Sequence, residues 1–101
     1  VKMTQKQITI DSIKEAVRGY YGLETSRLLE RTRKREVVVA RQMSMYLAKK
    51  YTALSLAGIG DVLGKKDHAT VLHACKTISE QVGVDKKLRS DLEEIEQRIQ
   101  G

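Results

Sequence analysis

The fold is decided by residues 55–78, SLAGIGDVLGKKDHATVLHACKTI, which predict two short helices separated by a tight turn. Ser55 is a residue type that caps helix N-termini, and Gly64 is a natural stop for the helix that follows Ser55. After two lysines, Asp67 caps a second helix. Two helices joined by a turn that contains glycine make a helix-turn-helix, here with a turn about one residue longer than the minimal pattern. We expect this unit at about 55–82, with helices at 55–63 and 67–82.

The first turn of the second helix carries side chains that suit the reading of DNA bases. In a helix-turn-helix the second helix enters the major groove, and its N-terminal residues meet the base edges. A carboxylate accepts a hydrogen bond from a cytosine amino group, and histidine and threonine form hydrogen bonds with donors or acceptors on the bases. An alanine methyl contacts a thymine methyl. A plainer interpretation stays open, because an aspartate at this position is also a good cap and the others are ordinary solvent-facing residues. The base-reading candidates are Asp67, His68, Ala69 and Thr70.

The rest of the chain also follows helical spacing, so we expect an all-α protein. Residues 37–39 are three valines, which favour a strand, but the helical apolar spacing continues to Tyr51 and favours a helix. No segment is typical of a linker, since the chain has no proline. We therefore predict a single domain over residues 1–101, folded as a small six-helix bundle that contains the helix-turn-helix. Its other four helices are expected at about 9–22, 24–30, 35–51 and 85–100.

Positive charge is concentrated in the middle of the chain. The net charge is +6, and residues 27–50 alone hold eight Lys or Arg against two Glu. From Thr77 onward, four basic residues face six acidic ones. A basic stripe on a small domain favours a polyanion as partner, with nucleic acid first and anionic lipid second. A protein- or membrane-interaction module, or a merely solvated lysine-rich face, also fits the charge.

The basic cluster RTRKRE, residues 31–36, adds a second candidate contact. It lies in the connection before the helix expected at 35–51, from where an arginine reaches an A/T-rich minor groove beside a major-groove helix. On that helix, Arg41 and Lys49 are two turns apart, which suits contacts to phosphates. A solvated loop is the simpler interpretation of the same cluster. Four Tyr and no Phe or Trp offer little stacking surface for single strands, so the expected nucleic acid is duplex DNA.

The sequence does not match the motifs of nucleotide-binding loops, metal sites or catalytic sites. GIGDVLGKKD, residues 58–67, lacks the Gly-Lys-Ser/Thr end of a phosphate-binding loop, and Leu63 occupies the third glycine position of a dinucleotide fingerprint. His68 and His73 are five residues apart, about 140° around a helix, and do not converge on a metal with Cys75. We find no catalytic set, signal peptide or membrane span, and expect no enzyme activity, cofactor or metal in this chain. A single cysteine fits a reducing cytoplasm.

Residues 37–78, VVVARQMSMYLAKKYTALSLAGIGDVLGKKDHATVLHACKTI, strongly resemble the C-terminal DNA-binding domain of the bacterial replication initiator DnaA. The blocks RQMxMxLA and IGxxxGxxDHxTVxHA carry the similarity, which is dense from about Arg33 to Ile78 and looser over nearly the whole chain. The resemblance implies an all-α helix-turn-helix domain that binds short, asymmetric, A/T-rich DnaA boxes in duplex DNA at the replication origin. It implies major-groove reading by Asp67, His68 and Thr70, and insertion of Arg33 in the minor groove. Contacts to the DNA backbone are implied for Arg41, Gln42, Lys49, His73, Lys76 and Thr77.

Two residues depart from the family pattern. Ala69 stands where the family commonly has Thr, so a methyl contact with thymine is retained but a hydroxyl bond is not. Ala57 stands where a proline usually follows the leucine that Leu56 matches, and we expect little change in fold because alanine also favours helix.

The resemblance also implies a larger parent protein. That parent is a cytoplasmic, nucleoid-associated initiator whose ATPase domain, with its ATP site, lies outside these residues. Acidic phospholipids near the N-terminal helix, and regulators that compete at the DNA-binding face, are further implied partners. With no dimer seam in the sequence and an asymmetric site implied, we expect a monomer on DNA.

Overall fold

The computed structural model describes residues 8–24, 28, 32–64 and 66–100. Over these residues every regular element is a helix, which confirms the all-α class. In chain order the helices are α1 (Ile10–Tyr21), α3 (Arg35–Tyr51), α4 (Leu56–Val62), α5 (His68–Gln81) and α6 (Lys86–Gln100). The helix expected at 24–30 lies mostly outside the described residues, so the count of six stays a prediction.

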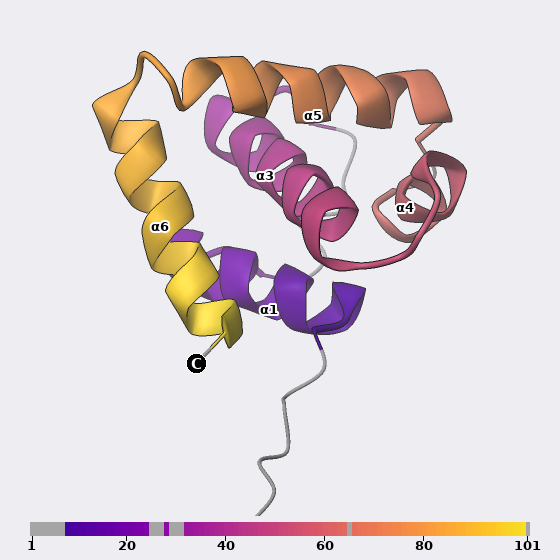
Figure 1. Ribbon diagram of the computed structural model, residues 1–101, viewed down its shortest axis with the longest axis horizontal. Helices are drawn as coiled ribbons and strands as arrows, with labels where there is room; N and C mark the ends of the chain where they lie inside the picture. The colour runs from indigo at the N-terminus through magenta and orange to yellow at the C-terminus, as the bar shows by residue number, and fades with distance from the viewer. Residues whose placement is uncertain (1–7, 25–27, 29–31, 65, 101) are drawn as a thin grey trace, which may run out of the picture.

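Helix α3 lies at the centre of the molecule and packs against α1, α4 and α5 (Figure 1). Helix α5 crosses one side of α3, α1 lies on the opposite side, and α6 runs from the end of α5 down to α1. Because α3 has neighbours on several sides, its buried residues are not confined to one stripe. They include Val37, which explains why a run of β-branched valines is accommodated in a helix: packing outweighs their modest helix propensity.

Local sequence fixes both ends of α1. The Thr9 hydroxyl accepts from the backbone N–H of Ser12 at 3.1 Å, and the Ser12 hydroxyl accepts from the backbone N–H of Thr9 at 3.1 Å. This reciprocal capping box satisfies two backbone donors at the start of the helix. Gly22 ends the helix with φ 68°, in the left-handed region that glycine adopts without strain. The helix so bounded presents Ile13 and Val17 to the core.

Arg41, for which sequence analysis predicts a contact to DNA phosphates, is buried in the structure. Its side chain is 8% exposed, and Nε donates to the carbonyl oxygen of Leu28 at 3.2 Å. Burial lowers the pKa of the guanidinium, although arginine stays charged in proteins. Arg41 is buried because α3 is the central helix, so that polar residues on several sides of α3 also face protein. Arg41 thereby fixes Leu28, itself fully buried, against α3.

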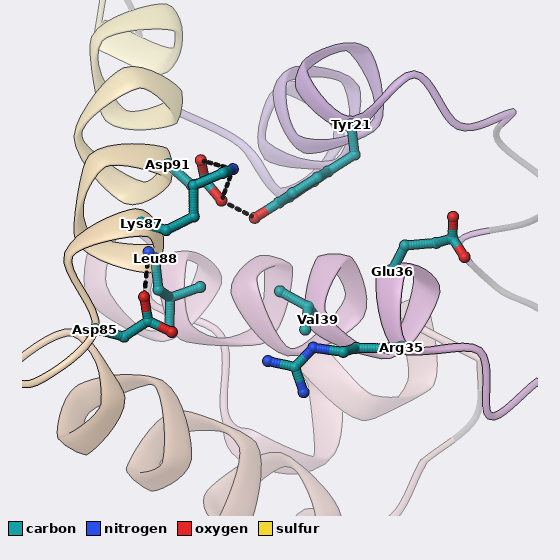
Figure 2. A pocket seen from close by; sticks show the side chains of 8 residues that line it. All are labelled: Tyr21, Arg35, Glu36, Val39, Asp85, Lys87, Leu88 and Asp91. Carbon is teal, nitrogen blue, oxygen red and sulfur yellow. Dashed lines mark hydrogen bonds and ion pairs between the residues drawn. The ribbon is translucent and has the colours of Figure 1, made fainter.

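A buried carboxylate joins α6 to α1 (Figure 2). Asp91, 4% exposed, accepts from the hydroxyl of Tyr20 at 2.5 Å and from that of Tyr21 at 3.3 Å. Lys87, one turn earlier in α6, forms an ion pair with the same carboxylate at 2.9 Å. Burial raises the pKa of Asp91, but the bonds from Tyr20 and Lys87 outweigh it and hold the pKa below its ordinary value. This network joins α6 to α1.

Candidate nucleic-acid interface

The first helix of the pair, α4, is bounded as its sequence predicts. The Ser55 hydroxyl accepts from the backbone N–H of Gly58 at 3.0 Å, which caps the N-terminus. The last turn closes with the N–H of Leu63 donating to the carbonyl of Ile59 at 3.0 Å, and both side chains are fully buried. Gly64 follows with φ 93°, where residues with a Cβ are strained, and turns the chain toward α5.

The turn packs directly on α4 at Gly60. The backbone N–H of Lys66 donates to the carbonyl of Gly60 at 2.8 Å. A Cβ at Gly60 would lie 1.9 Å from the carbonyl oxygen of Lys66 and 3.3 Å from Cγ2 of Val71 in α5. Only glycine therefore allows α4, the turn and α5 to approach this closely. Sequence analysis missed this role, although a second glycine inside a seven-residue helix is a signal, since glycine disfavours helix unless packing requires it.

The second helix, α5, begins with a turn whose side chains are all exposed. Oδ1 of Asp67 accepts from the backbone N–H of Thr70 at 2.9 Å, so Asp67 is the helix cap. Hydrogen bonding to Thr70 holds the pKa of Asp67 below its ordinary value. His68 and Ala69 are also exposed, whereas Val71 is fully buried. The four predicted base-reading residues are thus brought together at one end of α5, outside the core.

The outer face of α5 continues with the residues expected to contact phosphates. His73 and Lys76 are exposed and Thr77 is half-buried. The ring of His73 lies close to Thr77 one turn further on, with 3.5 Å between Nε2 and Oγ1. The inner face of the same helix forms a buried stripe of Val71, Ala74 and Ile78. Helix α5 therefore has one face that is buried in the core and one face that is exposed.

Helix α3 contributes two more of the predicted residues beside α5. Lys49 is exposed and lines a groove together with Lys76. Gln42 is half-buried and lines a smaller cavity, of about 200 Å³, together with Thr77. Lys50, next in sequence to Lys49, forms an ion pair with Glu96 of α6 at 2.6 Å instead.

Arg33 is exposed just before α3. Arg35, two residues later, lines one cavity with Thr77, so α3 begins beside the C-terminal half of α5. Asp67 marks the opposite end of α5. At 1.5 Å per residue, the stretch from Asp67 to Thr77 spans about 15 Å. The start of α3, which follows Arg33, is therefore separated along α5 from the first turn of that helix.

A second cavity, between α1, α3 and α6, differs in charge from this surface (Figure 2). Its volume is about 370 Å³, and its lining mixes Arg35 and Lys87 with Glu36 and Asp85. Within residues 8–24, 28, 32–64 and 66–100, no three His, Cys, Asp or Glu side chains are grouped as a metal site. No helix in that same part of the chain is long and apolar enough to cross a membrane.

Comparison with known proteins agrees with the resemblance. The family model described as the bacterial dnaA protein helix-turn-helix matches residues 10–78. The chain is 54% identical over 96 residues to the chromosomal replication initiator protein DnaA of Bacteroides fragilis (strain YCH46), covering 95% of this chain and 20% of that protein. It is 53% identical over 91 residues to the protein of the same name from Bacteroides thetaiotaomicron, and the match covers 90% of this chain and 19% of that protein. It is 44% identical over 99 residues to the chromosomal replication initiator protein DnaA of Flavobacterium psychrophilum, and the match covers 98% of this chain and 21% of that protein.

The chain spans about a fifth of the length of these curated relatives. The family match runs from the start of α1 into the last turn of α5 and includes the whole helix pair with its tight turn. The chain therefore belongs to the bacterial DnaA helix-turn-helix family.

Proposed function

We propose that this chain binds duplex DNA sequence-specifically at short A/T-rich DnaA boxes, with α5 in the major groove and Arg33 in the adjacent minor groove. One observation carries the proposal: the first turn of α5 presents four consecutive exposed side chains, Asp67 to Thr70, directly before the buried Val71. In a helix-turn-helix, side chains at this position meet base edges. The names of the relatives support a wider role for the parent protein in initiating chromosome replication, in which this chain supplies the contact with DNA.

The separation between the two predicted base-reading elements supports this arrangement. Arg33 comes two residues before Arg35, which lines a cavity with Thr77 in the C-terminal half of α5. Asp67 lies at the N-terminal end of the same helix. Two elements that are apart in this way suit a helix in a major groove and an arm in the adjacent minor groove.

The exposed cations suit contacts to the DNA backbone. Lys49 from α3 and Lys76 from α5 stand on either side of one groove, and His73 lies between the base-reading turn and Lys76. Such contacts fix the register of α5 on the duplex and set the salt dependence of binding. For Arg41 we propose an indirect role, because its guanidinium is buried and holds Leu28, in the segment that leads to Arg33.

A fluorescence-anisotropy titration tests the proposal, with a box duplex and a scrambled duplex compared at several salt concentrations. We expect Arg33→Ala and His68→Ala each to reduce discrimination between the duplexes by about 1–3 kcal/mol. Lys49→Ala should weaken binding to both duplexes alike and lower the salt slope by about one unit. Lys86→Ala, which removes an exposed lysine of α6, is the matched control and should leave the slope unchanged.

Two outcomes contradict parts of the proposal. If the parent protein binds both duplexes equally and loses both with salt, the interaction is electrostatic and not sequence-specific. If the parent discriminates but Arg33→Ala and His68→Ala do so equally well, other residues read the bases.

A further inference from the structure

A groove of about 520 Å³ lies between the C-terminal half of α3 and the middle of α5. Its lining is mainly apolar, with contributions from Tyr46, Leu72 and Cys75. Lys49 and Lys76 also line it, from the two helices, and no acidic side chain among the described residues does. The groove therefore combines an apolar surface with positive charge.

Leu72 is the most unusual residue of this groove. Its side chain is 55% exposed, and among the described residues only Val84 is a more exposed large apolar side chain. Leu72 lies one helical turn before Lys76, so an apolar contact point and a cation adjoin each other on α5. An apolar side chain left in water gains free energy when a partner covers it, and exposed apolar patches with polar rims are typical of interaction sites.

DNA phosphates explain only half of this composition. They would satisfy Lys49 and Lys76, but a hydrated phosphate gains nothing from contact with Leu72 or Cys75. The third lysine at the groove, Lys50, is already paired with Glu96 at 2.6 Å, so the available charges are Lys49 and Lys76. The complementary ligand has carboxylates spaced to meet these two lysines and an apolar side chain between them.

We propose that this groove binds an acidic amphipathic segment of a partner protein. The segment inserts an apolar side chain against Leu72 and Cys75 and places carboxylates on Lys49 and Lys76. This is the helix-in-groove mode of recognition, in which an apolar anchor supplies affinity and the charges set orientation. The inference goes beyond the proposed function because it requires no DNA.

A fluorescein-labelled synthetic helical peptide, with leucines on one face and glutamates on the other, tests the inference by anisotropy. We expect Leu72→Ser and Lys76→Ala in the protein each to weaken peptide binding at least about tenfold. The matched controls are Val84→Ser, which alters the other exposed apolar residue outside the groove, and Lys86→Ala on α6. Both controls should bind the peptide like the parent. Circular dichroism checks that each variant is folded, which the exposure of the altered side chains leads us to expect.

Cys75 provides a second, direct readout of occupancy. It is the only cysteine of the 101 residues, it is half-buried, and it lines the groove. Alkylation of its thiol by iodoacetamide therefore reports on access to this one place. The peptide should slow alkylation several-fold, while a peptide with its leucines replaced by glutamine should not.

The remaining outcomes overturn the inference. Absence of peptide binding, or binding that Leu72→Ser leaves unchanged, would mean that the groove is not a peptide site. Slower alkylation with phosphatidylglycerol vesicles but not with the peptide would assign the groove to lipid. Slower alkylation with the box duplex alone would assign it to DNA. The duplex titrations described above contain no peptide, so failure of the DNA proposal is measured separately.

Discussion

Replacing Gly60 with alanine tests the packing on which the helix-turn-helix depends. The new Cβ would lie 1.9 Å from the carbonyl oxygen of Lys66, and contacts of Cβ atoms below 3.0 Å essentially never occur, so the turn must move by about 1 Å. Overpacking of this kind costs about 1–3 kcal/mol, and loss of the bond from Lys66 to Gly60 adds about 1 kcal/mol. The better helix propensity of alanine offsets about 1 kcal/mol. We expect a net loss of roughly 1–3 kcal/mol.

Thermal unfolding followed by circular dichroism measures this loss. For a domain of this size, the change lowers Tm by roughly 5–20 °C. Gly19→Ala is the matched control, since Gly19 lies inside α1 and a Cβ there meets only the end of the Arg98 side chain, at 3.5 Å. That variant should be unchanged or stabilised by up to about 1 kcal/mol. A Gly60→Ala protein as stable as Gly19→Ala would refute the argument that the turn excludes a side chain. Binding to the box duplex, measured where both variants are folded, then shows whether displacement of the turn also displaces α5.

Three further predictions concern Asp67, Arg41 and Asp91. Asp67→Ala should lower the stability of the fold by about 1 kcal/mol because the helix cap is lost, whereas Asp67→Ser should keep the cap and the stability. If only the alanine variant loses discrimination between the box and scrambled duplexes, Asp67 acts as a cap and does not read a base. Arg41→Leu should destabilise the fold by about 1–3 kcal/mol in urea denaturation, because the carbonyl of Leu28 loses its hydrogen-bond donor. The control Lys49→Ala, which alters an exposed side chain, should have a stability within about 0.5 kcal/mol of the parent. The folded pKa of Asp91 is lowered, so its carboxylate stabilises the fold above the unfolded pKa of about 4, and this stabilisation is lost as the pH falls through the folded pKa. The Tm difference between the parent and Asp91→Asn should therefore shrink on acidification below pH 4, and a difference independent of pH would contradict this linkage.

Features set by local sequence could be predicted. Ser55 and Asp67 cap their helices through bonds to backbone groups three residues away, and Gly64 adopts a left-handed conformation, so a short window of sequence contains all the information. Five of the expected helix ranges enclose the five described helices. The exposure of the first turn of α5 also follows locally, since the residues before Val71 precede its buried stripe.

Features set by tertiary packing could not be predicted. Arginine is a residue type that is mostly exposed, and the central position of α3 buries Arg41. The close approach at Gly60 depends on where the chain returns six residues later. Asp91 lies among the acidic residues of an amphipathic helix, and nothing in that pattern indicates that tyrosines some 70 residues earlier will donate to it. Such contacts depend on the arrangement of whole helices, which periodicity does not specify.

The exposed first turn of α5 has a consequence for how binding preference can diverge within the family. His68, Ala69 and Thr70 support none of the core, so substitutions there change the surface offered to DNA at little cost in stability. Recognition can therefore drift, or be reselected from a randomised library at these three positions, while folding is conserved. Asp67 is the exception, because its cap couples the start of the helix to any contact that it makes.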